Sequence, residues 1–181
     1  MSKRQIFFSF RFKYDAWRAG IIRNMDKVSE ESTFSDNDWE KVKDEHDSTI
    51  KKWIDDEMKM RSCVIVLIGR YSSDRKWIDY EIEHAWKCGK GIVAIRIHKL
   101  KDSTGNQTDP GHDPLSDFVI DTTINYIAKR STLLQDEKKL SSICKTYNPP
   151  YQSSTGTYNY IKEHISDWIE EAIEIRNRYP K

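Results

Sequence analysis

The chain has 181 residues, of which 30 are Lys or Arg and 29 are Asp or Glu, giving a formal net charge of +1. This balance excludes the basic surface typical of nucleic-acid-binding proteins, and no Lys/Arg cluster marks a membrane-binding patch. The aromatic content of 12% argues against disorder. With no secretory or membrane-spanning apolar run, we expect one cytoplasmic domain over residues 1–181.

The first half of the chain alternates strand-like and helix-like segments. Residues 6–10 are short, apolar and β-prone, which is typical of a buried parallel strand. A helix follows, with Asp15 as its expected N-cap and with Trp17, Ile21 and Ile22 on its inner face. The further elements expected are a weak strand near Phe34, a helix at 47–60, a strand at 63–68, a helix from Trp77 to Cys88 and a strand at 92–97.

The second half is less regular. Turn signals predict a long loop at 99–113, the last sheet strand is expected at 124–127, and a short helix is expected at 133–147. Apolar residues in steps of three and four then predict an amphipathic helix over 158–178. The alternation in the first half indicates an α/β protein with an open parallel sheet and helices on both faces.

The three cysteines are widely spaced and include no CxxC pair, so they support neither a disulfide framework nor a zinc site. Cys63 and Cys88 have apolar neighbours and are expected to be buried free thiols. No metal ligand set is predicted.

One acid interrupts the apolar face of the Trp77 helix. On a helical wheel at about 100° per residue, Glu81 lies within the apolar stripe, whereas the other two acids of the helix lie opposite it. An acid in that position is costly unless it neutralises, finds a partner or borders a pocket. A structural ion pair with Arg11, Arg70 or Arg96 is one explanation, and a catalytic carboxylate is the other.

Open α/β sheets bind ligands outside the carboxyl ends of their strands, where the strand order reverses. In the order 2-1-3-4-5 this point lies between the first and third strands, which end near Ser9 and Gly69. Glu81, in the second turn of the following helix, is expected to face the same crevice. The residues predicted to converge there are Phe8, Ser9, Arg11, Arg70 and Glu81.

Four stretches carry a family resemblance: 7–10, the Phe34…Trp39-Glu40 segment, the strand end Ile68-Gly69, and 77–82. Together they resemble TIR-like domains and, more narrowly, the TIR-like subunit of bacterial Thoeris anti-phage systems. Trp77 and Glu81 match the WxxxE pattern of NAD-consuming TIR domains, which places the family's catalytic glutamate at Glu81. The resemblance implies a flavodoxin-like sheet of about five strands in the order 2-1-3-4-5, with a family-variable insertion around 99–157.

The resemblance also implies a reaction, cleavage of the nicotinamide–ribose bond of NAD through an oxocarbenium-like transition state. NAD is then the substrate, and no cofactor is expected. Attack by a ribose hydroxyl in place of water would give a cyclic ADP-ribose isomer, a diffusible signal that activates a separate effector protein. The residues expected to contact substrate beside Glu81 are Phe8, Ser9, Phe10, Arg11, Asp36, Arg70, Tyr71, Trp77 and His98.

Several of these residues have structural alternatives: Arg11 and Arg70 as solvated loop residues, Asp36 as an N-cap, Trp77 as core packing and His98 as an edge histidine. Two other functions stay open, a non-catalytic TIR-like interaction module, which would act by pairing with other TIR domains, and a nucleoside deoxyribosyltransferase-like enzyme. A homo-oligomer is compatible with each of them. The chain lacks GxxxxGK[ST] and GxGxxG, which argues against a P-loop NTPase and a dinucleotide redox fold.

Overall fold

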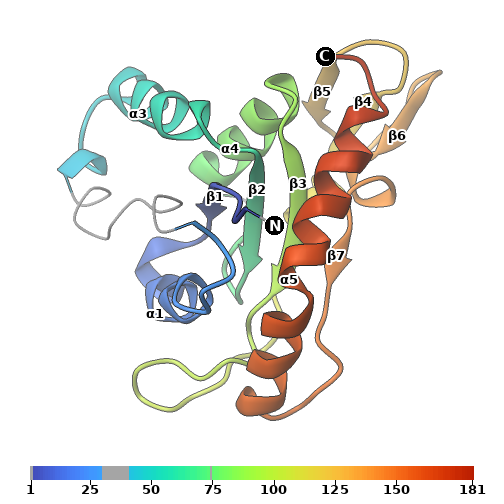
Figure 1. The fold of residues 1–181 in the computed structure, drawn as a ribbon. Helices are drawn as coiled ribbons and strands as arrows, with labels where there is room; N and C mark the ends of the chain where they lie inside the picture. Colours follow the sequence, from blue (N-terminus) through green and yellow to red (C-terminus); the bar gives the residue numbers. More distant parts are fainter. Residues whose placement is uncertain (1, 30–40, 74) are drawn as a thin grey trace.

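A computed structural model describes residues 2–29, 41–73 and 75–181. Its central parallel sheet has the order β1-β2-β3-β7 (Figure 1). The row Ser9–Val66–Ala94–Thr146 runs across all four strands. The strands are β1 (Ile6–Ser9), β2 (Cys63–Ile68), β3 (Gly91–Arg96) and β7 (Thr146–Tyr147).

Helices cover both faces of this sheet, because successive strand residues point to opposite sides and both sides are apolar (Figure 1). Phe7 and Val66 pack with α3 and α4 on one side, and Ile6 and Phe8 pack with α1 and α5 on the other. The described helices are α1 (Phe12–Arg23), α3 (Asp47–Lys59), α4 (Lys76–Lys87) and α5 (Ser154–Asn177). The predicted α/β class, with an open parallel sheet and helices on both faces, is confirmed.

A second, antiparallel sheet lies between β3 and β7 in the sequence, with the order β5-β4-β6. Phe118, Ile120 and Ile127 from this sheet join the core on the α3/α4 side. The elements are η1 (Pro114–Asp117), β4 (Phe118–Asp121), β5 (Tyr126–Lys129), β6 (Glu137–Lys139) and η2 (Leu140–Ser142).

Two predictions for this region are wrong. Residues 124–127 were expected in the parallel sheet, but they belong to a hairpin of the antiparallel sheet, and the last parallel strand is β7. The helix expected at 133–147 is replaced by β6, η2 and β7. The strand expected near Phe34 lies outside the described residues, so the sheet has four strands in the described part of the chain. Of these four described strands, β1, β2 and β3 occupy the predicted places 1, 3 and 4, and β7 takes the place of the predicted fifth strand, so strand count and order differ slightly from the predicted 2-1-3-4-5.

The inner face of α1 also differs from expectation. The helix begins at Phe12, so Asp15 lies in its first turn and is not its N-cap. Trp17, expected inside, is 58% exposed. The buried positions of α1 are Asp15, Arg18, Ala19 and Ile22.

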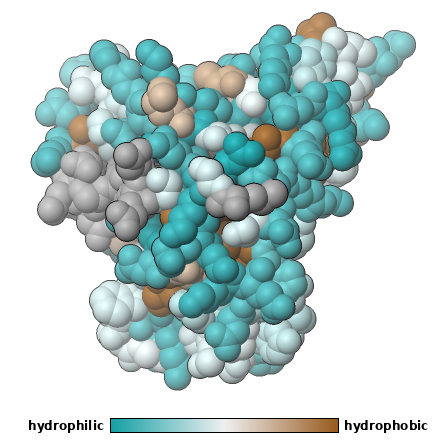
Figure 2. Space-filling view, viewed as in Figure 1, coloured by the Kyte–Doolittle hydropathy of each residue, from teal (hydrophilic) through white to brown (hydrophobic). Residues whose placement is uncertain are grey.

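The surface shown in Figure 2 is largely hydrophilic, with apolar side chains scattered over it. Within the described ranges, no helix combines the length and apolar character needed to cross a bilayer. Cys88 is exposed at the end of α4, contrary to expectation, whereas Cys63 and Cys144 are buried.

Candidate functional site

Glu81 and Ser9 meet at the carboxyl end of β1. Glu81 lies on the inner face of α4 and is 5% exposed, and Ser9, the last residue of β1, is fully buried. The Ser9 hydroxyl donates a hydrogen bond to Glu81 Oε2. The predicted convergence of these two residues is therefore present in the structure.

In the described part of the chain, Glu81 is a buried acid without a counter-ion. Burial raises the pKa of Glu81 to about 8, and the hydrogen bond from Ser9 opposes this rise. Among the residues that the structure describes, no cation lies within ion-pair distance of the Glu81 carboxyl. The carboxyl is thus largely protonated at neutral pH, and an arriving positive charge would favour its ionised form.

The three arginines considered as structural partners of this carboxyl have other contacts. Arg96 donates to a main-chain carbonyl of the 99–113 loop at 2.6 Å. Arg70 lies 3.6 Å from the carboxylate of Asp109. Arg11 lies over a tyrosine ring, 5.5 Å from its centroid. A structural ion pair therefore does not explain the buried acid.

Comparison with known proteins identifies the family of the chain. A family model described as "Thoeris protein ThsB, TIR-like domain" matches residues 7–102, just over half of the chain. The chain belongs to the Thoeris TIR-like family. A relative in Bacillus cereus (strain MSX-D12), named "Putative cyclic ADP-D-ribose synthase ThsB1", is 32% identical over 119 residues, 63% of this chain and 62% of that protein. The match thus covers less than two thirds of the relative's length.

The match to the Thoeris TIR-like family includes the WxxxE segment on α4. Trp77, its first residue, is partly buried against the core on the α3/α4 side. Its ring meets Tyr80 edge-on at 6.3 Å, and the Lys76 ammonium lies 4.8 Å from its centroid. Trp77 therefore packs α4 against the core one turn before Glu81.

A cluster of two tyrosines and two arginines lies beside the ends of β1 and β2 in this Thoeris domain. The rings of Tyr14 and Tyr71 are 4.7 Å apart and about two-fifths exposed, at 44% and 41%. Arg11 lies over Tyr14, and Arg70 lies over Tyr71. The structure thus brings together three predicted substrate residues and adds Tyr14. Sequence reasoning missed Tyr14 because it placed the start of α1 after this residue.

Two other predicted site residues, Phe8 and Phe10, lie on the opposite side of the sheet from α4, which carries Glu81. Phe8 packs in the core on the α1/α5 side, the opposite face from Ser9, and Phe10 is partly buried on that same side. His98 is 5% exposed, and within the described ranges its Nδ1 atom has no hydrogen-bond partner. Burial together with neighbouring cations lowers its pKa. Asp36 lies outside the described residues.

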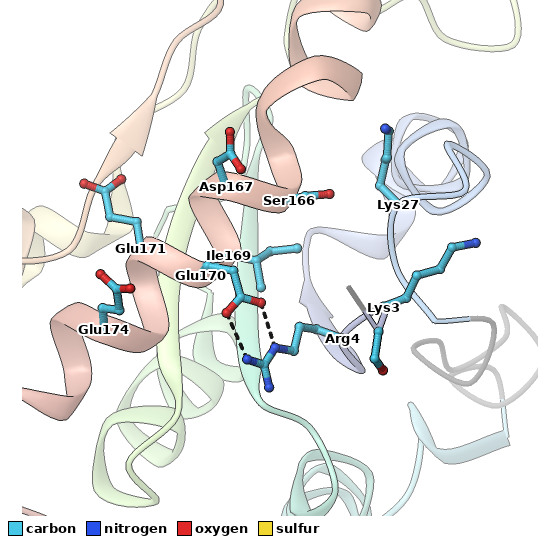
Figure 3. Close-up of a pocket in the computed structure, with 10 residues that line it drawn as sticks. Lys3, Arg4, Lys27, Ser166, Asp167, Ile169, Glu170, Glu171 and Glu174 are labelled. Atoms are coloured by element: carbon cyan, nitrogen blue, oxygen red, sulfur yellow. Dashed lines mark hydrogen bonds and ion pairs between the residues drawn. The ribbon is translucent and has the colours of Figure 1, made fainter.

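A separate hollow of about 320 Å³ lies between α5 and the segment that precedes β1 (Figure 3). Arg4 reaches across it and donates two hydrogen bonds to Glu170, at 2.7 and 2.9 Å. Lys3, on the same wall, pairs with Asp26. These pairs lie at the amino end of β1, so the hollow is not part of the Glu81 site. In the described ranges, no group of three or more His, Cys, Asp or Glu side chains is placed to hold a metal ion.

Proposed function

We propose that this Thoeris TIR-like domain cleaves the nicotinamide–ribose bond of NAD, with Glu81 as the catalytic carboxylate. The observation that carries the proposal is the buried Glu81 carboxyl, which accepts a hydrogen bond from Ser9 and has no cation beside it in the described structure. Perturbed acids of this kind concentrate at functional sites. NAD supplies the missing positive charge, first on its nicotinamide ring and then on the ribose at the transition state.

The chemistry follows from this placement. The bond from ribose C1′ to the ring nitrogen breaks, its electron pair leaves with nicotinamide, and positive charge develops on the ribose. An ionised Glu81 stabilises that charge, and strongly so because the side chain is buried away from water. Ser9 holds one carboxylate oxygen, which orients the other toward the ribose.

The second half of the reaction decides the product. A ribose hydroxyl of the adenosine half attacks C1′, forms the new bond and releases its proton, which gives a cyclic ADP-ribose isomer and neutral nicotinamide. Attack by water at the same carbon would give linear ADP-ribose. We favour the cyclic product because the Bacillus cereus relative is named as a cyclic ADP-D-ribose synthase. The Thoeris family match supports a separate effector protein as the receiver of this signal.

Release of nicotinamide from NAD tests the proposal. Glu81→Gln preserves the shape of the side chain and removes its charge, so turnover should fall by at least about 100-fold. Glu83→Gln is the matched control, because this acid lies on the same helix, is 35% exposed and pairs with Lys87. Ser9→Ala should cause a smaller loss.

Mass spectrometry of the products then separates the cyclic from the linear isomer. The assay is run with and without lysate from phage-infected cells, in case turnover needs a trigger. Folded wild-type protein that releases no nicotinamide under either condition would refute the proposal and favour the interaction module. Full turnover by Glu81→Gln would remove Glu81 from the reaction.

A further inference from the structure

A second buried acid lies at the same edge of the sheet, on α1. Asp15 and Arg18 are each 2% exposed, and Arg18 Nη1 lies 3.5 Å from Asp15 Oδ1. Asp15 Oδ2 is buried and has no hydrogen-bond partner among the described residues. A surface helix does not need such a pair for solubility, and burying two charges is expensive. The packing of α1 alone therefore does not explain why Asp15 and Arg18 are buried.

Arg18 reaches away from α1 to the loop at 99–113, here called the edge loop. Its Nε donates to the carbonyl of Leu100 at 2.8 Å, and its Nη2 donates to the carbonyl of Asn106 at 3.0 Å. Nη2 also lies 3.8 Å from the carboxylate of Asp102. One guanidinium thus fastens two main-chain points of the edge loop, a geometry that lysine does not reproduce.

The other end of the edge loop lies on the chain that leaves β2. A Cβ added to Gly111 would lie 2.0 Å from the carbonyl oxygen of Gly69 and 2.9 Å from that of Arg70. A Cβ added to Gly69 would in turn lie 2.2 Å from Asp15 Oδ2. Gly69 is therefore held between the carboxylate of Asp15 and the backbone of Gly111, and a side chain fits on neither glycine.

Gly69 opens the connection from β2 to α4, the helix that carries Glu81. We propose that Asp15 and Arg18 are positioning residues for the reaction at Glu81, because they hold the edge loop and Gly69 in place where this connection begins. The proposal rests on the proposed NAD cleavage. The family match ends at residue 102, so most of the edge loop lies beyond it while both positioning residues lie within it.

The charges around Asp15 give this arrangement a pH dependence. Arg18 and Arg11 are the cations that act on Asp15, while Asp102 and His98 face Arg18 from the far side. Burial raises the pKa of Asp15 to about 6, and Arg18 opposes this rise. Protonation of Asp15 below that pH removes one of the two carboxylate partners of Arg18, and we expect the edge loop to loosen.

Steady-state kinetics of Asp15→Asn and Arg18→Lys test the proposal. We expect each to lower kcat/KM at pH 7 by roughly 10- to 100-fold, the scale of a displaced catalytic group. The wild-type kcat/KM, which Glu81 already makes rise with pH, should fall more steeply below about pH 6, and Asp15→Asn should lack this additional acid limb. Gly111→Ala should reproduce the loss by displacing the loop from Gly69. Gly20→Ala is the control, because its added Cβ meets nothing within 4 Å.

Hydrogen exchange gives a second readout that does not depend on turnover. The Thr108 amide, which donates to His98 O at 3.0 Å, should exchange at least about tenfold faster in Arg18→Lys than in the wild type. Asp15→Asn mimics the protonated acid and should remain folded. Wild-type kcat/KM in these variants, with an unchanged acid limb, would overturn the positioning role alone. A wild type without turnover would refute the proposed function, and the positioning role would fall with it.

Discussion

The buried state of Glu81 predicts that Glu81→Gln makes the protein more stable at neutral and alkaline pH. Folding raises the pKa of Glu81 from 4.5 to about 8, so between these values the folded protein binds the proton more tightly than the unfolded chain does. The contribution of the neutral Glu81 side chain to the free energy of unfolding is fully present below pH 4.5 and is lost as the pH rises toward 8. Each pKa unit is worth about 1.4 kcal/mol, so the Glu81 contribution falls by about 3 kcal/mol between pH 5 and pH 8.

Reversible urea unfolding at pH 5, 6, 7 and 8 measures this difference. With a typical urea m value, the midpoint of Glu81→Gln should exceed that of the wild type by roughly 1 M more at pH 8 than at pH 5. Asp15 also titrates in this range, but its contribution is common to both proteins and cancels. Glu83→Gln, on the solvent side of α4, should show no such trend. A gap between wild type and Glu81→Gln that stays constant with pH would mean that water reaches this carboxyl in the folded state, and the site as argued would be wrong.

Three further predictions concern catalysis, thiols and packing. If the ionised form of Glu81 is required, kcat/KM should rise with pH through about 8. The hydrogen bond from Ser9 lowers the pKa of Glu81, so its removal in Ser9→Ala should raise that pKa and move the rise in kcat/KM to higher pH. Identical pH profiles of the two proteins would contradict this. A thiol reagent should titrate only Cys88 in the native protein, since burial raises the pKa of both other thiols, and three equivalents should react in denaturant. Arg176 is 1% exposed and donates two hydrogen bonds to the Trp86 carbonyl. Arg176→Met should therefore lower the free energy of unfolding, measured by urea titration, by about 3 kcal/mol. A loss below about 1 kcal/mol would show that these hydrogen bonds contribute little to stability.

The three long parallel segments and α4 could be predicted because their signals are local. A continuous apolar run is typical of a strand buried on both faces, and β1, β2 and β3 follow that pattern. On α4, an acid within an apolar stripe identified Glu81 without knowledge of its neighbours. The contact with Ser9 then followed from sheet topology, because the carboxyl ends of parallel strands lie at one edge.

The remaining elements depend on contacts that no local pattern carries. Among the described strands, β6, which is Glu-Lys-Lys, pairs with β4 alone, and β7 is two residues long and pairs with β3. On α1, an exposed Trp17 and a buried Asp15 reverse the usual preferences of both residues. Asp15 is buried because Arg18 is buried with it, and Arg18 is buried because carbonyls of a loop more than 80 residues away accept its hydrogen bonds.

The two buried acids at this edge discriminate between a structural and a catalytic explanation of Glu81. Asp15 lies beside a buried guanidinium, which opposes the rise in its pKa and ties the acid into the fold. Glu81 is about as deeply buried, but its neighbour is the neutral hydroxyl of Ser9, and its pKa rises further. If Glu81 had only a structural role, a neutral or apolar residue at this position would make the protein more stable. The destabilisation predicted for Glu81 at neutral pH therefore favours the proposed role, in which a positive charge arrives with the substrate.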